Sequence, residues 1–212
     1  MSELWAALGT VVDPELDQPI TDLGFVSEAV VAAGHARVRL RLPTYFCAPN
    51  FAYLMVADAY DAVRALPSVT SVDVRLADHF AAAEINAGVA ASAGFAGAFP
   101  GLAAGDLAEL RLTFRRKAYL ASLDRLLLLS GATAAIGEVP PSPARDAMLR
   151  RRAALGLDCA PDAPLLLDEH GAPLTPPRRR YARSVRLSIE GNAGFCRGLL
   201  RTRYPEVLNR SV

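Results

Sequence analysis

Residues 36–42 read ARVRLRL, and this alternation of apolar and basic side chains decides how the first part of the chain folds. A period of two is typical of a β-strand with one buried face and one solvent face. The preceding residues 32–35, AAGH, contain a glycine suited to a turn, and residues 25–31 before them are strand-like. We therefore predict a hairpin of two strands at this point.

A helix and a third strand follow the hairpin. Apolar residues recur at helical spacing over residues 51–66, and Leu66-Pro67-Ser68 ends that pattern. Residues 70–76 then alternate again, as a half-buried strand does. A short helix capped by Ser2 comes first, so the order is α-β-β-α-β. We expect the last β-α-β step to be a right-handed parallel crossover.

The chain changes character from Asp78 onward, where alanine and glycine become frequent. Residues 79–97 predict a loosely determined helix, because each interior glycine costs about 1 kcal/mol relative to alanine. A stronger helix is expected between Asp106 as N-cap and Gly131, where a C-terminal glycine belongs. The prolines near residue 140 lead into a further helix over residues 143–155.

Two short stretches of the second part suggest a small β element. Residues 165–174 fit a small hairpin, and residues 184–189 alternate like a strand before a final helix at 195–203. We therefore predict the α/β (α+β) class. A two-layer α-β-β-α-β domain covers residues 1–77, and a mainly α-helical extension with a small β element covers residues 78–212.

Composition and charge exclude several classes of protein. The 212 residues are 52% hydrophobic and 21% charged, which is a globular composition. A formal net charge of +1 gives no reason to expect nucleic-acid binding. No apolar run approaches the roughly 20 residues that span a bilayer. The start MSELWAALG lacks the features of a secretion signal, so we expect a cytoplasmic protein without membrane partners.

The chain has three cysteines, Cys47, Cys159 and Cys196, and this odd, sparse count argues against a disulfide framework. They form no CxxC pair, which argues against a locally encoded zinc or cluster site. Cys47 is the best candidate for chemistry, because it precedes the predicted helix start near Pro49. Unpaired N–H groups at a helix start stabilise a thiolate, which makes it a better nucleophile or metal ligand. The alternative is a buried structural cysteine that behaves as a small hydrophobe.

Five further side chains are candidate metal ligands. Asp13 and Glu15 flank a proline and could reach a metal or a basic partner; the alternative is an ordinary turn with solvated acids. His79 could bind a metal together with Asp78 or Glu84. His79 and Glu84 are five residues apart, however, so they do not share a helix face as an i, i+4 pair does. The alternative is a hydrogen-bonded structural histidine.

Other motifs are less specific. Cys196 follows a glycine-containing turn at residues 191–194 and could complete a site with Cys47 in the fold or in an oligomer. Two basic clusters, Arg115-Arg116-Lys117 and Arg178-Arg179-Arg180 with Arg183, are either solvated surface or a docking surface for an acidic protein. No Ser-His-Asp constellation, HExxH or Walker motif is found, so we do not predict an enzyme.

The first part of the chain resembles a known family, the SufT/PaaD-like iron–sulfur cluster assembly proteins. The resemblance rests on DPE at residues 13–15, ITDLGFV at 20–26, LPTYFCAP at 42–49, LPSV at 66–69 and VDV at 72–74. It covers about residues 2–77 and implies the same α-β-β-α-β fold. Cys47 corresponds to the key reactive cysteine of the family, and Asp13 and Glu15 fall on its acidic motif. Here Ala48 separates the cysteine from the proline, where many members have Cys-Pro directly.

The resemblance implies an accessory protein that assists cluster assembly in, or delivery to, a client metalloprotein. The PaaD branch serves a multicomponent di-iron oxygenase system. The long extension, which lacks the cysteine-rich zinc region of many PaaD-like proteins, resembles members associated with bacterial soluble di-iron monooxygenases. The implied client is therefore a di-iron monooxygenase subunit, and the implied cargo is transient iron or an iron–sulfur cluster.

One thiol cannot hold a cluster, which generally needs four ligands. A homodimer, the client, or His79, Glu84 and Cys196 of the extension would have to complete the site around Cys47. Two alternatives remain to the function of carrying iron or a cluster. One is a folding chaperone or adaptor that binds no metal. The other is an enzyme with Cys47 as nucleophile, which needs a base within hydrogen-bond reach.

Overall fold

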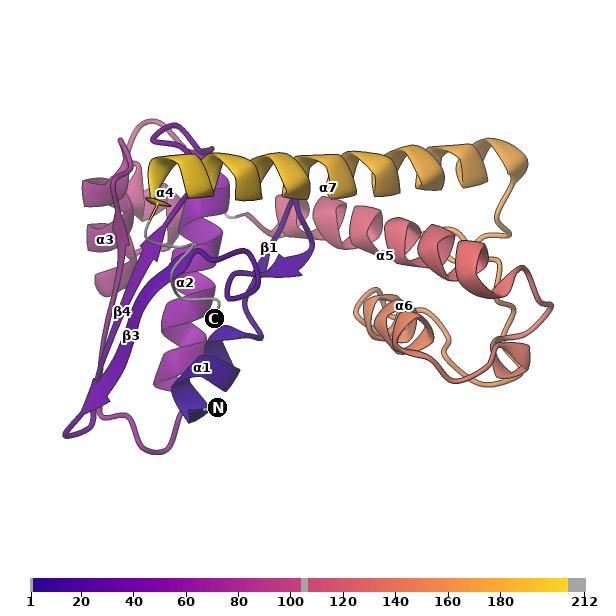
Figure 1. The fold of residues 1–212 in the computed structure, drawn as a ribbon, viewed down its shortest axis with the longest axis horizontal. Helices are drawn as coiled ribbons and strands as arrows, with labels where there is room; N and C mark the ends of the chain where they lie inside the picture. Colours follow the sequence, from indigo (N-terminus) through magenta and orange to yellow (C-terminus); the bar gives the residue numbers. More distant parts are fainter. Residues whose placement is uncertain (1, 104–106, 206–212) are drawn as a thin grey trace. The chain divides into compact units, whose positions relative to one another are not determined.

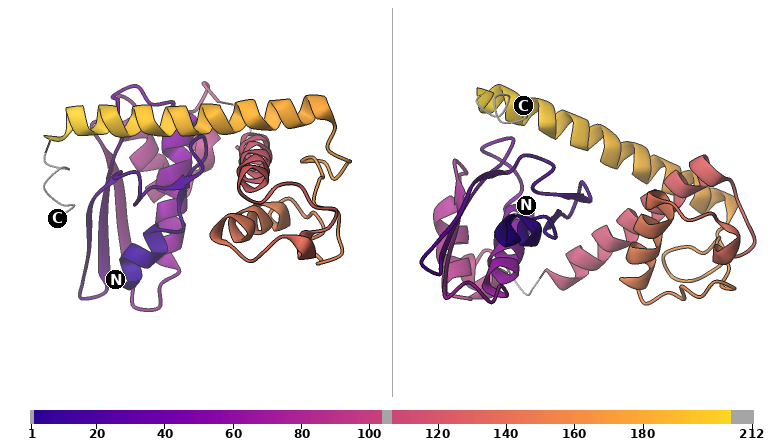
Figure 2. Two further views of the ribbon diagram at one scale, coloured as in Figure 1. Left: turned by 45° about the vertical axis from the view of Figure 1, so that its right-hand side comes forward. Right: turned by 60° about the horizontal axis from the view of Figure 1, so that its bottom comes forward.

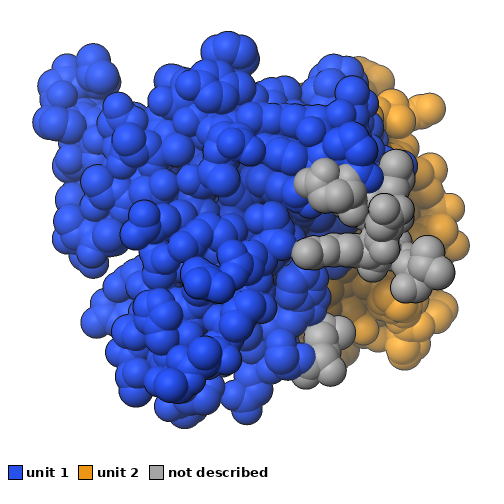
Figure 3. Space-filling view, turned by 60° about the vertical axis from the view of Figure 1, so that its left-hand side comes forward, with its two compact units in different colours: residues 1–108, 192–212 blue, residues 109–191 orange. Residues whose placement is uncertain are grey.

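The computed structural model of the protein describes residues 2–103 and 107–205. The chain divides into two compact units (Figure 3). Unit 1 comprises residues 1–108 together with 192–212, and unit 2 comprises residues 109–191. Unit 1 contains the sheet and unit 2 is mainly helical, which confirms the α+β class. The predicted division after residue 77 follows the family resemblance and stays a prediction.

The sheet of unit 1 has the order β3-β4-β5, formed by Val26–Ala32, His35–Arg41 and Ser71–Ala77. Strand β3 pairs antiparallel with β4, and β4 pairs parallel with β5, which confirms the predicted hairpin and crossover. The turn between β3 and β4 needs Gly34, whose φ is 79°. A Cβ at Gly34 would lie only 2.7 Å from Thr70 Oγ1, so a larger residue would clash there.

Two helices cover one face of this sheet (Figures 1 and 2). Helix α1, Glu3–Leu8, begins at Ser2, whose Oγ accepts a hydrogen bond from the Trp5 N–H as predicted. Helix α2, Pro49–Arg64, contacts β5 directly. Alternate residues of β4 and β5 and one face of α2 form the core of unit 1, including Ala36, Val38, Leu40, Val74, Leu76, Ala52, Met55, Val56, Ala59 and Val63. Burial of these side chains is the main force that stabilises the unit.

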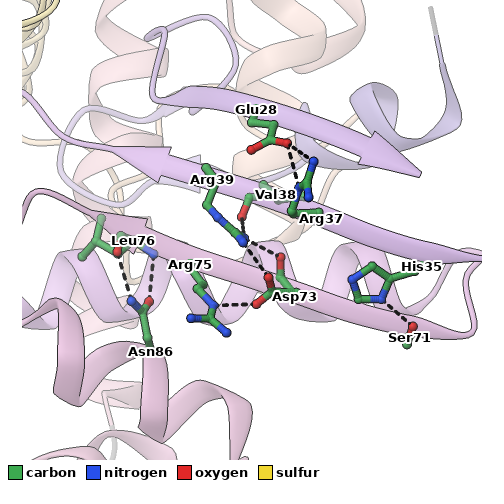
Figure 4. A network of polar contacts seen from close by, with 10 residues as sticks. All are labelled: Glu28, His35, Arg37, Val38, Arg39, Ser71, Asp73, Arg75, Leu76 and Asn86. Atoms are coloured by element: carbon green, nitrogen blue, oxygen red, sulfur yellow. Dashed lines mark hydrogen bonds and ion pairs between the residues drawn. The ribbon is translucent and has the colours of Figure 1, made fainter. Parts of the chain in front are cut away.

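The basic residues of the alternating strand carry a network of ion pairs (Figure 4). Arg37 pairs with Glu28 of β3 at 2.7 Å, and Arg39 pairs with Asp73 of β5 at 2.6 Å. Arg75 Nε donates to the same carboxylate of Asp73 at 2.8 Å. These pairs link all three strands, although partly exposed ion pairs contribute at most about 1 kcal/mol each.

Two short helices, α3 (Ala82–Ala90) and α4 (Gly94–Ala98), replace the single helix predicted over residues 79–97. Ser92 in the break between them and Gly94, the first residue of α4, both have positive φ. Helix α3 protects the free edge of β5, because the Asn86 side chain bonds both the N–H and the carbonyl of Leu76 at 2.8 and 3.0 Å (Figure 4). An edge strand thereby gains partners where a further strand would otherwise pair.

Unit 2 contains most of helix α5, Ala108–Ser130, together with α6, Pro143–Ala153. Gly131, with φ 76°, directly follows α5 as predicted, whereas Asp106 lies outside the described residues. The core of the unit gathers Tyr119, Leu120, Leu123, Leu126, Ile136, Val139, Met148 and Leu165. A short 3-10 helix, η1 (Ile136–Glu138), contributes to it.

A buried arginine organises the loop after α6. Arg152 is fully buried, and its guanidinium donates to the carbonyls of Asp158 (2.6 Å), Pro164 (2.9 Å) and Leu165 (3.2 Å). These bonds offset the cost of removing the charge from water. The predicted hairpin at residues 165–174 is reduced to one isolated bridge, between Leu167 and Pro173.

Helix α7, Pro176–Arg203, is one unbroken helix (Figure 2). The predicted strand at residues 184–189 is therefore wrong, and the predicted final helix is only the end of α7. The buried positions recur at helical spacing, namely Ala182, Val185, Ile189, Ala193 and Leu200, whereas Leu187 is 52% exposed. Residues 176–191 belong to unit 2 and residues 192–203 to unit 1. Within the described ranges no helix combines the length and hydrophobicity needed to cross a membrane.

Candidate functional site

Cys47 lies in the loop between β4 and α2, just before the N-cap residue Ala48. Its side chain is half-buried, and its sulfur lies 3.3 Å from Thr44 Oγ1. The N–H of Phe46 donates to the same hydroxyl oxygen at 3.3 Å, which leaves the hydroxyl hydrogen available for the sulfur. Thr44 can therefore donate a hydrogen bond to the Cys47 sulfur.

His79 holds this loop from the end of β5. The side chain is 5% exposed, and its Nδ1 accepts a hydrogen bond from the Ala81 N–H at 3.2 Å. The proton of a neutral ring then sits on Nε2, which donates to the Cys47 carbonyl at 2.7 Å. Burial lowers the pKa of His79; the bond to Cys47 opposes this, and the charge of Arg203 adds to it. Both ring nitrogens are thus engaged in positioning the loop.

Asp13 lies at a tight turn between two short strands, which the sequence analysis did not predict. Strand β1, Val12–Asp13, pairs antiparallel with β2, Gln18–Pro19. Asp13 is 7% exposed, and its Oδ1 accepts hydrogen bonds from the N–H groups of Glu15 (2.9 Å) and Leu16 (2.8 Å). Burial is the main cause that raises the pKa of Asp13 to about 6, against the lowering effect of these two bonds. The solvated-acid alternative therefore does not describe Asp13.

Cys196 of α7 lies near the other candidates within unit 1. Burial chiefly, and then the charges of Cys47, Asp13 and Glu15, raise the pKa of the Cys196 thiol to about 11. One turn earlier on the same helix, Asn192 donates to Glu15 Oε1 at 3.4 Å. Cys47 and Cys196 both pack against the core of unit 1. Four residues named from the sequence are therefore brought into one neighbourhood.

The end of α7 also fixes the segments around Cys47. The Arg203 guanidinium donates to the carbonyl of Leu42 at 3.2 Å and to the carbonyl of Asp78. The Tyr204 hydroxyl donates to the Asp78 carboxylate at 2.9 Å, and Arg41 lies 4.5 Å from the centre of the Tyr204 ring. This helix end therefore bonds the start of the Cys47 loop and the residue before His79, a role that the sequence analysis missed.

Three aromatic side chains beside Cys47 are exposed. Tyr45, Phe46 and Phe80 are 47, 77 and 48% exposed, and their ring centres lie 5.1 to 6.3 Å apart. The His79 ring lies 4.9 Å from Phe80, so this aromatic cluster continues to the residue that holds the loop. Exposed apolar patches of this kind often mark interaction sites. The signal in the sequence was the aromatic pair next to the candidate cysteine.

The neighbourhood does not form a preassembled metal site. Among residues 2–103 and 107–205, no group of three or more His, Cys, Asp or Glu side chains is arranged to hold a metal ion. Glu84 lies exposed in the first turn of α3. Cys159 belongs to unit 2, where its sulfur lies 3.4 Å from the Leu157 carbonyl. The metal-binding roles predicted for Cys47, His79, Glu84 and Cys196 stay predictions.

Comparison with known proteins finds one family. Residues 2–74 match the family model of the iron-sulfur cluster assembly protein, and the matched segment contains Asp13, Glu15 and Cys47. Cys196 lies outside it. No curated protein and no solved structure matches the chain. The match supports a role in cluster assembly or metalloprotein maturation, which agrees with the more general of the expectations from the sequence.

Proposed function

We propose that the protein is a non-enzymatic maturation factor that assists assembly of an iron–sulfur or di-iron centre in a client protein, and that Cys47 receives the cargo. The observation that carries this proposal is the family match over residues 2–74, which includes the loop of Cys47. The half-buried thiol in that loop has a hydroxyl donor and a histidine-anchored backbone beside it.

The residues around Cys47 act by holding one thiol in place. The Thr44 hydroxyl lies within hydrogen-bond distance of the Cys47 sulfur, and His79 keeps the carbonyl of Cys47 in place through Nε2–H. Because burial favours the neutral ring of His79, this donor arrangement persists at neutral pH. A single well-oriented thiol binds iron or a cluster weakly, which suits a carrier because a carrier must release its cargo.

Further ligands come from the surrounding acids and the second thiol. Cys196 favours its protonated form in the free protein, because burial is the main cause that raises its pKa to about 11. Burial also raises the pKa of Asp13, to about 6. An arriving cation favours the anionic forms instead, so loading would release protons. Glu15 is available in the same neighbourhood. A full set of four cluster ligands requires the client or a second copy of the chain in addition.

The client is the less specified part of the proposal. A di-iron monooxygenase hydroxylase is the candidate, from the resemblance to the SufT/PaaD branch. The exposed cluster of Tyr45, Phe46 and Phe80 offers an apolar contact surface beside the thiol, where a client would have to approach.

The test is anaerobic reconstitution with iron and sulfide, followed by metal analysis and absorption spectra. Wild type, Cys47→Ser, Cys196→Ser and Cys159→Ser are compared. Cys159→Ser is the matched control, because it removes a thiol of similar burial in the other unit. We expect iron retained by wild type and by the control, lost in Cys47→Ser and reduced in Cys196→Ser. Equal retention in all four proteins would contradict cargo binding at Cys47.

The second candidate is a folding chaperone or adaptor that binds no metal. It is favoured by the finding that, in the part of the chain that the structure describes, no three potential ligands are grouped for a metal. In that case wild type retains no specific iron, and Cys47→Ser still supports activation of the client. Alanine substitution of Phe46, which is 77% exposed, would then impair the client more than loss of the thiol does.

A further inference from the structure

The two basic clusters of the sequence meet in unit 2. They lie about 60 residues apart in the chain, yet both line one pocket of about 220 Å³. Arg116 and Lys117 of α5 contribute from the first cluster, and Arg178 of α7 contributes from the second. The hydroxyl-bearing residues Thr113 and Tyr181 line the same pocket. Folding thus turns two runs of charge into one concave cationic site.

The carboxylate in the pocket wall is already neutralised. Glu169 is 5% exposed, and Arg178 binds it in a bidentate manner, with Nε donating to Oε2 at 3.0 Å and Nη2 contacting Oε1. His170 Nε2 lies 3.5 Å from the same carboxylate. A buried acid of this kind fixes the guanidinium of Arg178 at the wall, because bidentate pairs are geometrically specific. The positive charge that remains in the pocket is that of Arg116 and Lys117.

Those two cations, Arg116 and Lys117, have no acidic partner among the described residues. Neither Arg116 nor Lys117 makes an ion pair with a residue in the described ranges, although both are half-buried and the Lys117 ammonium lies 4.8 Å from the Phe114 ring centre. Elsewhere in the unit arginines do find acids, as Arg125 pairs with Glu190 at 3.0 Å. Half-buried, uncompensated cations that converge on a pocket are suited to an external anion.

The net positive charge of unit 2 also favours an anionic partner. Residues 109–191 contain fourteen Arg and Lys and nine Asp and Glu, a formal charge of +5, whereas the whole chain carries only +1. Arg115, Arg179 and Arg180, next in sequence to the pocket residues, are exposed. An anionic partner larger than the pocket would therefore meet further cations around it, and its approach would be accelerated.

We propose that this pocket is a recognition site for an acidic polypeptide segment, with one carboxylate side chain held by Arg116 and Lys117 beside the Arg178–Glu169 pair. The volume of about 220 Å³ accommodates an acidic side chain. Proteins that bind single-stranded nucleic acid without sequence preference offer open aromatic faces for stacking. Here Arg178 covers the Tyr181 ring at 4.4 Å. The site is separate from Cys47, and its existence does not depend on metal transfer.

The test uses the full-length protein and a fluorescein-labelled all-glutamate peptide of about eight residues, followed by fluorescence anisotropy. The variant is Arg116→Gln/Lys117→Gln, which removes two charges without breaking an ion pair between described residues. The matched control is Arg64→Gln/Arg150→Gln, which removes two exposed charges from α2 and α6. Because hydrogen bonds to charged groups are strong, we expect roughly tenfold weaker binding for the variant and less than about twofold change for the control.

Two charge-conserving measurements complete the experiment. The single variant Arg116→Lys keeps the positive charge and should therefore retain most of the wild-type affinity for the peptide. Added salt should weaken binding of the peptide by wild type. The proposal is overturned if wild type does not bind the peptide at low salt, or if the two double variants lose affinity equally. Tighter binding of an oligothymidine of equal charge than of the peptide also overturns it, in favour of nucleic acid.

Discussion

Asp13 combines deep burial with two backbone hydrogen bonds, and burial has the larger effect on its ionisation. A group whose pKa is raised on folding, here from 3.8 to about 6, binds a proton more tightly in the folded state. Its stabilising contribution is complete below pH 3.8 and is lost as the pH rises through about 6. At neutral pH the buried charge therefore lowers stability, a cost that proteins commonly accept at functional positions.

We predict that Asp13→Asn removes this pH dependence. The amide oxygen can still accept the N–H groups of Glu15 and Leu16, so the turn is kept. The free energy of unfolding of wild type should fall by on the order of 2 kcal/mol between about pH 4 and pH 7, relative to the variant. Urea unfolding at several pH values measures this, with the exposed Asp22→Asn as control. Parallel curves for wild type and Asp13→Asn would refute the prediction.

The Cys196 thiol should react slowly with an alkylating reagent in the free protein. Burial chiefly, and then the charges of Cys47, Asp13 and Glu15, raise its pKa to about 11. We predict that alkylation of Cys196 by iodoacetamide near pH 8 is roughly tenfold slower than in urea, because the loss of thiolate outweighs the gain in nucleophilicity. In the folded protein the rate should still increase at about pH 10. Peptide mass spectrometry gives the rate, and a plateau already near pH 9 would disprove the raised pKa.

At the scale of the element, the apolar residues of α7 fit two periodicities, that of a strand and that of a helix. Val185, Leu187 and Ile189 are spaced as in a strand with one apolar face. In a helix, Val185 and Ile189 face the same side and Leu187 does not. The structure follows the helical spacing, with Ile189 buried at 7% exposure and Leu187 at 52%.

This difference gives a direct test of α7. Ile189→Asp places a charge in a buried position and should destabilise the protein by about 3 kcal/mol or more. Leu187→Asp should change the free energy of unfolding by less than about 0.5 kcal/mol. Chemical denaturation of both variants measures the two effects. Similar losses in both would indicate a strand, in which the two side chains share a face.

At the scale of the whole molecule, unit 1 is completed by residues far away in the sequence. Ala193 and Leu200 of α7 belong to the same core as the sheet, with exposed fractions of 1 and 2%. Arg203 bonds carbonyls on either side of the candidate site, those of Leu42 and Asp78. The segment that matches the family model is therefore stabilised by a helix end that lies outside the match.

We predict that Leu200→Ala destabilises unit 1 by about 2 to 4 kcal/mol through loss of buried surface and the remaining cavity. The matched control is Phe195→Ala on the same helix, whose side chain is 67% exposed and should be nearly neutral. Hydrogen exchange should show faster exchange in residues 2–77 for Leu200→Ala only. Unchanged protection there would show that α7 does not contribute to the stability of this segment.

The sequence by itself determined the local order of elements in residues 2–77. The signals were local patterns: the alternation in ARVRLRL, the helical spacing of residues 51–66 and Ser2 as N-cap. Each of them is visible among residues only a few positions apart in the chain. It also identified Cys47 before the start of α2 and the acidic pair at Asp13 and Glu15, because both lie in short motifs.

Only the tertiary structure decided which distant groups come together. Helical spacing was obscured in α7 by an equally regular period of two, which burial against the core resolved. The bond from His79 Nε2 to the Cys47 carbonyl, the placement of Cys196 near Asp13 and the union of two basic clusters depend on contacts across more than 30 residues. Such contacts arise from packing and desolvation, which have no local pattern in the chain.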